Sequence, residues 1–150
     1  MASNDLFFDT SLIFALLNGK VSSALNRRLN HNFKSGGLPH INADKWAVLQ
    51  NLYKKDGVTQ QMLCDNTKYD KPSMTRLIDS LEEQGLVLRR VNKEDKRERR
   101  ILLTVAGREL EEKASYIANR TLKESLRGLT PDEIRICQEV LRKVFINSSR

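Results

Sequence analysis

The stretch that most constrains the fold runs from residue 85 to residue 104, where two short apolar runs enclose a highly charged centre. The flanking runs, Leu86–Leu88 and Ile101–Leu103, contain aliphatic and β-branched side chains that are typical of strands. The polar residues between them are typical of the tip of a hairpin. The pattern therefore predicts a β-hairpin.

The centre of this predicted hairpin is strongly basic. Seven basic and three acidic side chains lie between Arg89 and Arg100, so this short stretch carries more than half of the chain's net charge of +7. A charged run by itself is more often a solvated loop than a binding site. With the basic character of the whole chain, however, it points to an acidic partner, either nucleic acid or an anionic membrane surface.

Length and composition limit the remaining possibilities. A chain of 150 residues with few Gly and Pro predicts a single, mostly helical domain over residues 1–150. Two cysteines, Cys64 and Cys137, are too few for a disulfide framework, so we expect reduced thiols. The early apolar run Leu12–Leu17 is too short to cross a bilayer and lacks a basic leader, so we expect a cytoplasmic protein without membrane contact.

Helical periodicity and capping residues define the other elements. One apolar stripe predicts a first helix from about Leu6 to Asn30, weakened at Gly19. Val58 is a candidate for a very short edge strand, and Gly85 is expected to end the helix before the hairpin. Five further helices are predicted from their N-caps, which are Asn42, Thr59, Asp70, Thr104 and Thr130, the last in a capping box with Glu133.

The order of elements predicts two functional parts. Residues 34–104 form a helix-turn-helix followed by a wing, and the helices in residues 6–33 and 105–147 flank it. The flanking helices look like a dimerisation platform, because the first is apolar over more than one stripe and a second subunit would supply a packing partner. The last helix is expected to bury one stripe, made of Ile134, Cys137, Val140, Leu141, Val144 and Phe145.

Several motifs in this order resemble the MarR family of bacterial winged-helix transcription regulators. They are Thr59–Leu63, Asp70–Leu77, Leu81–Val87, the Asp95-x-Arg97 of the wing, and Leu103-Thr104-x-x-Gly107. The resemblance implies a mainly α (α+β) fold with a winged helix-turn-helix between long dimerisation helices. It also implies a homodimer that binds pseudo-palindromic double-stranded DNA, and many members are repressors that a small, often aromatic, molecule releases from DNA. We expect no enzymatic activity and no cofactor.

By the same resemblance, residues of the recognition helix and the wing are expected to contact DNA. Ser73, Thr75 and Arg76 would enter the major groove, which admits a helix. Arg97 would enter the minor groove at the wing tip, with Asp95 orienting Arg97 or Arg99 by a charge-assisted hydrogen bond. Further candidates are the phosphate contacts Lys71, Lys96, Arg99 and Arg100, and Gln60 and Gln61, for which simple solvent exposure is an equal alternative.

Other kinds of site find weaker support in the sequence. Phe14, Trp46, Tyr53 and Tyr116 are candidates for an effector pocket, although aromatic residues at helical spacing are more often plain core. His31 and His40 have no neighbouring ligands that would suit a metal, and both cysteines are expected to be buried rather than redox-active. A winged helix that binds proteins instead of DNA remains an alternative, and no catalytic constellation supports an enzyme.

Overall fold

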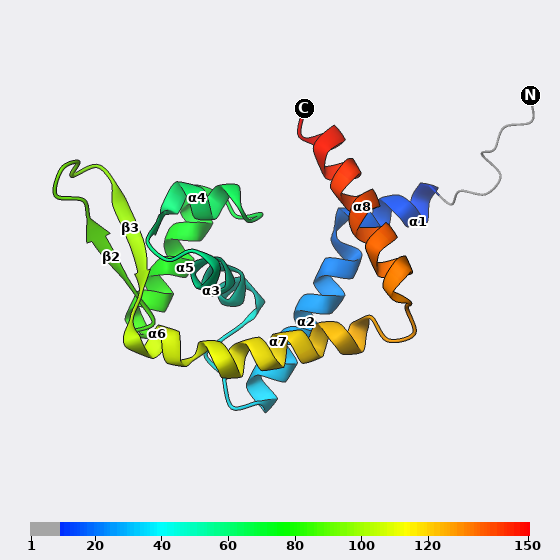
Figure 1. Cartoon of the computed structure of the whole chain (residues 1–150), viewed down its shortest axis with the longest axis horizontal. Helices are drawn as coiled ribbons and strands as arrows, with labels where there is room; N and C mark the ends of the chain where they lie inside the picture. Colours follow the sequence, from blue (N-terminus) through cyan, green and yellow to red (C-terminus); the bar gives the residue numbers. More distant parts are fainter. Residues whose placement is uncertain (1–9) are drawn as a thin grey trace, which may run out of the picture.

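The computed structural model describes residues 10–150, and Figure 1 shows two groups of elements. Residues 6–9, the predicted start of the first helix, lie outside the described part. The winged helix comprises α3 (Ala43–Lys54), β1 (Val58–Thr59), α4 (Gln60–Asp65), α5 (Lys71–Glu83), β2 (Val87–Val91), β3 (Arg99–Leu103) and α6 (Val105–Glu109). Beside it lie α1 (Thr10–Ala15), η2 (Leu16–Lys20), α2 (Val21–Ser35), α7 (Glu111–Ser125) and α8 (Pro131–Ser148). The predicted fold class, mainly α with a small sheet, is confirmed.

All five predicted N-caps are confirmed. In each, the side chain of the capping residue accepts a hydrogen bond from a backbone N–H three residues later, which satisfies a donor that the helix cannot. The pairs are Asn42 with Lys45, Thr59 with Met62, Asp70 with Ser73, Thr104 with Gly107, and Thr130 with Glu133. Glu133 returns the bond to the N–H of Thr130 and completes the predicted capping box.

The first predicted helix is not continuous. The chain bends at Asn18 and Gly19, where Gly19 has a φ of +112° that suits glycine because it has no Cβ. The bend separates α1 from α2, and α2 then runs to Ser35, beyond the predicted end. The prediction that Gly19 weakens the helix is therefore confirmed as a break.

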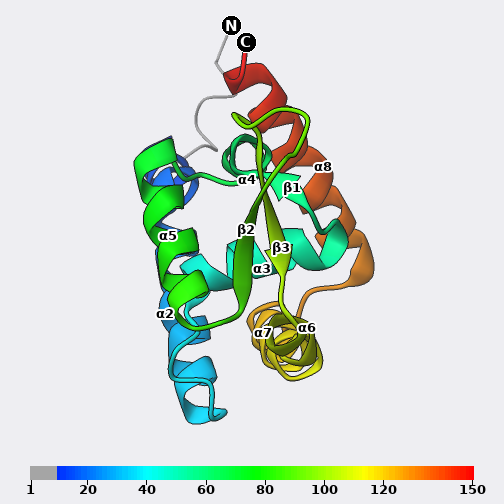
Figure 2. The ribbon, with the colours of Figure 1, turned by 90° about the vertical axis from the view of Figure 1, so that its left-hand side faces the viewer.

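The three strands form an antiparallel sheet in the order β1-β3-β2, which confirms the short edge strand at Val58. In the register of the hairpin, Arg89 lies opposite Ile101, Arg90 opposite Arg100, and Val91 opposite Arg99. Opposed residues share a face, and successive residues alternate between faces. The basic side chains of the wing are therefore divided between two faces, with Arg89 and Arg99 on one and Arg90 and Arg100 on the other. Figure 2 shows the hairpin beside α5.

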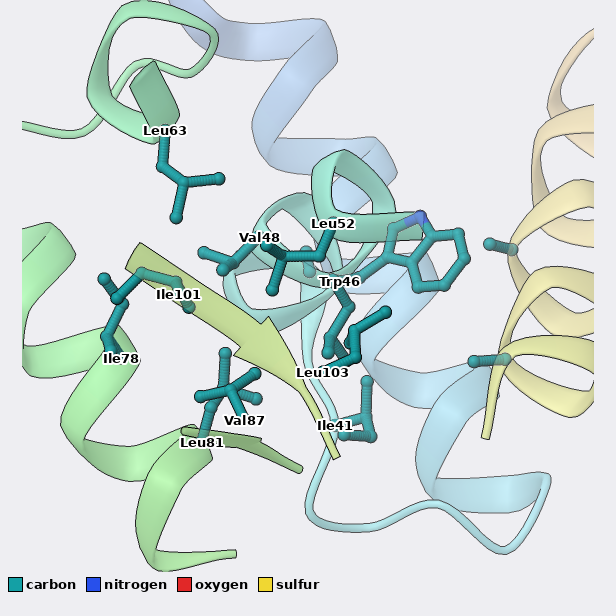
Figure 3. Packing of buried hydrophobic residues seen from close by; sticks show 14 of the residues in the cluster. Ile41, Trp46, Val48, Leu52, Leu63, Ile78, Leu81, Val87, Ile101 and Leu103 are labelled. Atoms are coloured by element: carbon teal, nitrogen blue, oxygen red, sulfur yellow. The ribbon is translucent and has the colours of Figure 1, made fainter. Parts of the chain in front are cut away.

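The core of the winged helix lies between α3, α5 and the sheet (Figure 3). Leu49, Ile78 and Leu81 are fully buried there. Trp46 is also buried, with its ring centroid 6.0 Å from that of Phe33 and 6.1 Å from that of Tyr53. These contacts join the winged helix to α2, so the core continues toward the second group of elements.

The base of the hairpin is fixed by close backbone contacts. A Cβ on Gly107 would lie 2.2 Å from the carbonyl oxygen of Leu86, so α6 can approach the hairpin only with glycine at this position. The hydroxyl of Thr104 donates to the carbonyl oxygen of Gly85 at 2.6 Å, and the hydroxyl of Tyr53 donates to that of Gly107 at 2.7 Å. Burial, with a contribution from Glu111, raises the pKa of Tyr53 to about 12.

The second group of elements buries fewer of its apolar side chains. Helices α2 and α7 pack together, with Asn32 Nδ2 donating to the buried Thr121 Oγ1 at 2.8 Å. In contrast, α8 buries no residue, and Val140 and Phe145 are 51% and 71% exposed. The prediction that α8 buries its apolar stripe is therefore wrong for the single chain: in the structure of residues 10–150, Ile134 is half-buried and the rest of the stripe, including Cys137, is exposed. Figure 1 shows α8 at the end of the molecule away from the wing.

Within residues 10–150, no helix combines the length and the hydrophobicity that crossing a bilayer requires.

Candidate nucleic-acid interface

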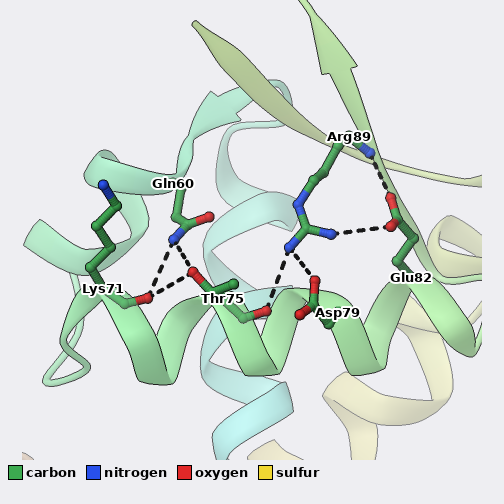
Figure 4. Close-up of polar contacts among 6 residues, drawn as sticks. All are labelled: Gln60, Lys71, Thr75, Asp79, Glu82 and Arg89. Carbon is green, nitrogen blue, oxygen red and sulfur yellow. Dashed lines mark hydrogen bonds and ion pairs between the residues drawn. The ribbon is translucent and has the colours of Figure 1, made fainter. Parts of the chain in front are cut away.

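A groove of about 810 Å³ lies between α4, α5 and the wing. Most of the residues predicted from the sequence to contact DNA line this groove, although they come from three separate elements. Its polar and charged lining consists of Thr59, Gln60, Gln61, Lys71, Thr75, Asp79, Glu82, Arg89, Arg97, Glu98 and Arg99. Figure 4 shows six of these side chains between α4, α5 and β2.

Two of the nominated residues bind each other. Gln60 Nε2 donates to Thr75 Oγ1 at 2.7 Å and more weakly to the carbonyl oxygen of Lys71 at 3.4 Å. Thr75 Oγ1 in turn donates to the same carbonyl oxygen at 2.9 Å. The start of α4 is thereby joined to the first turns of α5 (Figure 4). Gln61 is exposed and instead donates to Asp65 Oδ1 at 2.8 Å.

The start of α5 carries a charged cap. Asp70 Oδ1 accepts the backbone N–H of Ser73 at 2.9 Å, and this bond, with a second from the Ser73 side chain, holds the pKa of Asp70 below its usual range. Ser73 is half-buried, whereas Lys71 and Arg76 are exposed. A cation and a hydroxyl therefore flank the same helix end that lines the groove.

The tip of the wing is shaped by Asp95. Its carboxylate accepts the backbone N–H of Arg97 at 3.0 Å, and its carbonyl oxygen accepts the N–H of Glu98 at 3.1 Å. In the part of the chain that the structure describes, Asp95 makes no ion pair, so the expected bond to an arginine side chain is absent. Asp95 bends the backbone and leaves the side chains of Lys96 and Arg97 exposed.

Strand register separates Arg99 from Arg100. Arg99 lines the groove, whereas Arg100 lies on the opposite face of the hairpin. There, Arg100 Nη1 donates to the carbonyl oxygen of Gly57 at 2.7 Å, and Nη2 lies 2.6 Å from Glu98 Oε1. Arg100 thus joins the wing to β1 and does not share the groove with the other candidates.

Sequence reasoning missed the role of Arg89. The sequence shows it only as one basic residue among seven, whereas the fold directs its side chain across the groove to α5. Nη2 lies 2.6 Å from Asp79 Oδ1, and Nη1 lies 3.1 Å from Glu82 Oε1. The carboxylates at positions 79 and 82, one turn apart on α5, were the available signal, but pairing them with Arg89 requires knowledge of how the hairpin packs.

The four aromatic residues predicted to line an effector pocket do not all come together. Phe14 and Tyr116 are 69% and 64% exposed on α1 and α7, whereas Trp46 is buried in the core beside Tyr53. Trp46 and Tyr53 therefore have the plain core role that sequence analysis gave as the alternative. A single pocket lined by all four residues is not formed, because the buried face of α7 consists of Ala114, Ile117, Ala118 and Thr121 instead.

The two cysteines differ in exposure. Cys64 is half-buried beside the groove, and burial, together with Asp65 and Asp70, raises its thiol pKa. A raised pKa lowers the fraction of reactive thiolate. Cys137 is exposed, which corrects the expectation that both are buried. Across residues 10–150, no group of His, Cys, Asp and Glu is arranged to hold a metal ion.

Comparison with known proteins agrees with this geometry. A model of the MarR family matches residues 37–98, from the turn before α3 to the tip of the wing. The winged helix of this chain is therefore similar to that of the MarR family. Proteins of this family are transcriptional regulators rather than enzymes.

Solved structures of the MarR family resemble nearly the whole chain. A mutant MarR from E. coli, crystallised with operator DNA, is 26% identical with a TM-score of 0.79, covering 92% of this chain and 97% of that one. A MarR regulator from Methanosarcina mazei Go1 is 28% identical with a TM-score of 0.73, covering 87% and 94%. A MarR-family regulator from Rhodococcus sp. RHA1 is 22% identical with a TM-score of 0.78, covering 92% and 95%. The MarR likeness thus includes the terminal helices as well as the winged helix.

Proposed function

We propose that the chain is a cytoplasmic, homodimeric regulator that binds a pseudo-palindromic operator in double-stranded DNA and acts as a repressor. The observation that carries the proposal is the groove, where Lys71, Arg97 and Arg99 gather from α5 and the wing beside the polar start of α4. Cations converging from separate elements suit a phosphate backbone. The likeness to a MarR structure that contains operator DNA adds support.

In this proposal α5 enters the major groove and the wing enters the minor groove. Ser73, Thr75 and Arg76 are assigned to the major groove, where Arg can pair with guanine in a bidentate manner. Arg97 is assigned to the minor groove, whose narrow stretches attract arginine. The assigned phosphate contacts are Lys71, Lys96 and Arg99, with the N–H groups at the start of α4 near Gln60 and Gln61. Arg100 would reach DNA only from the other face of the wing.

The exposure of apolar side chains supports separate parts for DNA binding and for dimerisation. We assign residues 34–104 to DNA binding and residues 6–33 and 105–147 to dimerisation. Apolar side chains of α1, η2 and α8 are exposed in the single chain, including Ile13, Leu17, Val140 and Leu141. Contiguous exposed apolar surface marks an interface. A symmetric pair would present its two α5 helices about 34–36 Å apart, which is one turn of B-DNA.

Release by a small aromatic effector completes the proposal. A pocket of about 350 Å³, lined by Leu38, Pro39, Ile41, Leu86 and Leu110 among others, lies where the winged helix meets the start of α7. A molecule bound there would touch both parts of the protein. Replacing Leu110 with Trp should fill the pocket and abolish the response of a preformed DNA complex to such a molecule; an unchanged response would place the effector elsewhere.

Selection of bound duplexes from a random pool tests DNA recognition directly. We expect an inverted repeat whose half-sites are centred about one helical turn apart. With the selected site, affinity should fall about 10³-fold or more between about 50 and 200 mM salt if six or more phosphates are contacted. Failure to enrich any sequence, together with a flat salt response, would favour the alternative of a protein-interaction module.

The role of the wing tip has its own test. Arg97→Ala should weaken binding to the selected site by about tenfold or more, because it removes one arginine contact to DNA. Arg142→Ala on α8 is the control, because it removes the same charge outside the groove. Equal affinities of the two variants would contradict the wing assignment.

A further inference from the structure

The side chain of Arg89 joins the wing to the recognition helix at several points. Besides the two ion pairs with Asp79 and Glu82, its backbone N–H donates to Glu82 Oε2 at 3.1 Å. Nη2 also approaches the carbonyl oxygen of Thr75 at 3.5 Å. Figure 4 shows the guanidinium lying over α5, held by side chains one turn apart. We call Arg89, Asp79 and Glu82 the Arg89 cluster.

The geometry of the Arg89 cluster distinguishes it from an ordinary surface ion pair. The side chain of Arg89 is 18% exposed, whereas those of Asp79 and Glu82 are 58% and 43% exposed. A planar guanidinium that binds carboxylates through both terminal nitrogens is fixed in orientation as well as in position. Such a cluster can set an angle between two elements, which a single flexible pair of charges does not.

The Arg89 cluster lies between β2 and α5, so the angle concerned is the one between the wing and the recognition helix. β2 is an edge strand, because the sheet order is β1-β3-β2, and the bond from Arg89 N–H to Glu82 uses a donor of that open edge. Beyond Val91 the hairpin continues to the exposed Arg97, and Arg76 is exposed on α5. The Arg89 cluster thus joins the wing by side-chain bonds to α5, the helix that bears Arg76.

We propose that Arg89 is a positioning residue for DNA binding: by bonding to Asp79 and Glu82, it holds the wing at the angle to α5 at which both elements engage DNA together. This inference rests on the proposed function and adds a residue that makes no contact with DNA. Both terminal nitrogens of Arg89 donate to carboxylates of α5, so turning the guanidinium toward a phosphate would break the Arg89 cluster.

Neutralising the carboxylates provides the sharpest test, because simple electrostatics and positioning predict opposite results. Asp79→Asn with Glu82→Gln adds two units of positive charge to a groove that faces a polyanion, so charge alone predicts tighter binding. Positioning predicts that affinity for the selected duplex falls about tenfold or more, since the wing contacts are no longer held in register. The control is Glu83→Lys, which changes the charge by the same amount at an exposed neighbour on α5.

A double-mutant cycle separates positioning from a contact made by Arg89 itself. If Arg89 acts through the wing, Arg97→Ala should cost about tenfold in the native chain but less than about threefold in the Arg89→Ala background. If Arg89 binds DNA independently or only stabilises the fold, the two losses should multiply. Arg89→Lys should bind DNA more tightly than Arg89→Ala but less tightly than the native chain, because an ammonium cannot hold both carboxylates in a fixed plane.

The outcomes distinguish this inference from the proposed function. Measurable binding by the native chain, with the Asp79→Asn/Glu82→Gln variant bound equally or more tightly, would overturn the inference and leave the proposed function standing. The same holds if the Arg97 and Arg89 losses multiply. Absence of binding by the native chain to any duplex would overturn both. If Arg89→Ala does not fold, the carboxamide variant decides alone, since its changes are on an exposed helix face.

Discussion

The winged helix and the terminal helices place similar apolar side chains in opposite environments. Ile78 and Leu81 of α5 are fully buried against the sheet, whereas Leu141 and Val144 of α8, also three residues apart, are 48% and 37% exposed. The winged helix therefore completes its core within one chain, and α8 does not. The difference teaches that helical periodicity indicates that a face will be covered, without indicating by which molecule.

The largest effect should come from charging the exposed face of α8. Val140→Glu with Val144→Glu would place two carboxylates in the proposed subunit interface, and unpaired buried charge is strongly unfavourable. We expect the mass in solution to halve, and operator affinity to fall about 100-fold or more because a monomer contacts one half-site. Light scattering after size exclusion and DNA titration provide the two measurements.

Arg142→Glu is the matched control for this variant. It changes the net charge by the same two units, on the polar side of the same helix. It should remain dimeric and bind DNA. If the native chain is already monomeric, the proposed subunit interface on α8 is wrong, and its exposed apolar face would need another partner.

A pair of identical truncations should sharpen the contrast in burial. Ile78→Ala removes atoms from a fully buried side chain and should cost about 2–5 kcal/mol in the free energy of unfolding. Ile136 is 51% exposed, and Ile136→Ala should change it by less than about 0.5 kcal/mol. Urea unfolding in the Val140→Glu/Val144→Glu background measures both without a contribution from dimerisation. Similar losses for the two variants would show that α8 is covered within one chain.

Gly107 tests the base of the hairpin. Gly107→Ala would force a Cβ to within 2.2 Å of the Leu86 carbonyl oxygen, and two backbones must separate to relieve the contact. Overpacking of this kind costs about 1–3 kcal/mol or more. Thermal unfolding should show the loss, while Val105→Ala, at a 73% exposed position in the same helix, should change little. A native-like melting temperature for Gly107→Ala would mean that α6 moves freely on the hairpin.

The smallest effect concerns alkaline pH. The pKa of Tyr53 is raised from 10.0 to about 12 by burial and by Glu111, so the folded state favours the neutral phenol. This contribution is complete below the unfolded pKa of 10.0 and is lost as the pH rises toward about 12. In that pH window, the free energy of unfolding of the Tyr53→Phe variant should therefore fall less steeply than that of the native chain. Identical pH profiles would contradict the assignment.

Local chemistry made much of the fold predictable. Each capping residue binds a backbone N–H only three residues away, so its role can be predicted from the adjacent sequence. These residues are Asn42, Thr59, Asp70, Thr104 and Thr130. The short strand at Val58 and the weakness at Gly19 were likewise predicted from local signals, although the sequence predicted one helix there and not a break. Residues whose structural partner is close in the chain can be interpreted without the fold.

Partners distant in the chain account for what the sequence did not reveal. Arg89 binds Asp79 and Glu82 across the groove, and Arg100 faces away from Arg99, because strand register decides the face of each side chain. A shift of one residue would exchange the faces, and the charged run contains no apolar alternation that would fix the register in advance. The exposure of Cys137 was missed for a different reason, since its position in an apolar helical stripe predicts burial, whereas α8 buries no residue in this structure.

The junction between α6 and α7 has a mechanical consequence. Leu110, which separates them, keeps a nearly helical backbone with φ −71° and ψ −23°, and its N–H still bonds to the carbonyl oxygen of Ala106. Because α6 is held against the hairpin at Gly107, a change in the direction of α7 would reach the base of the wing through this junction. At 1.5 Å per residue α7 is about 22 Å long, so even a small rotation at the junction would correspond to a large displacement at its far end.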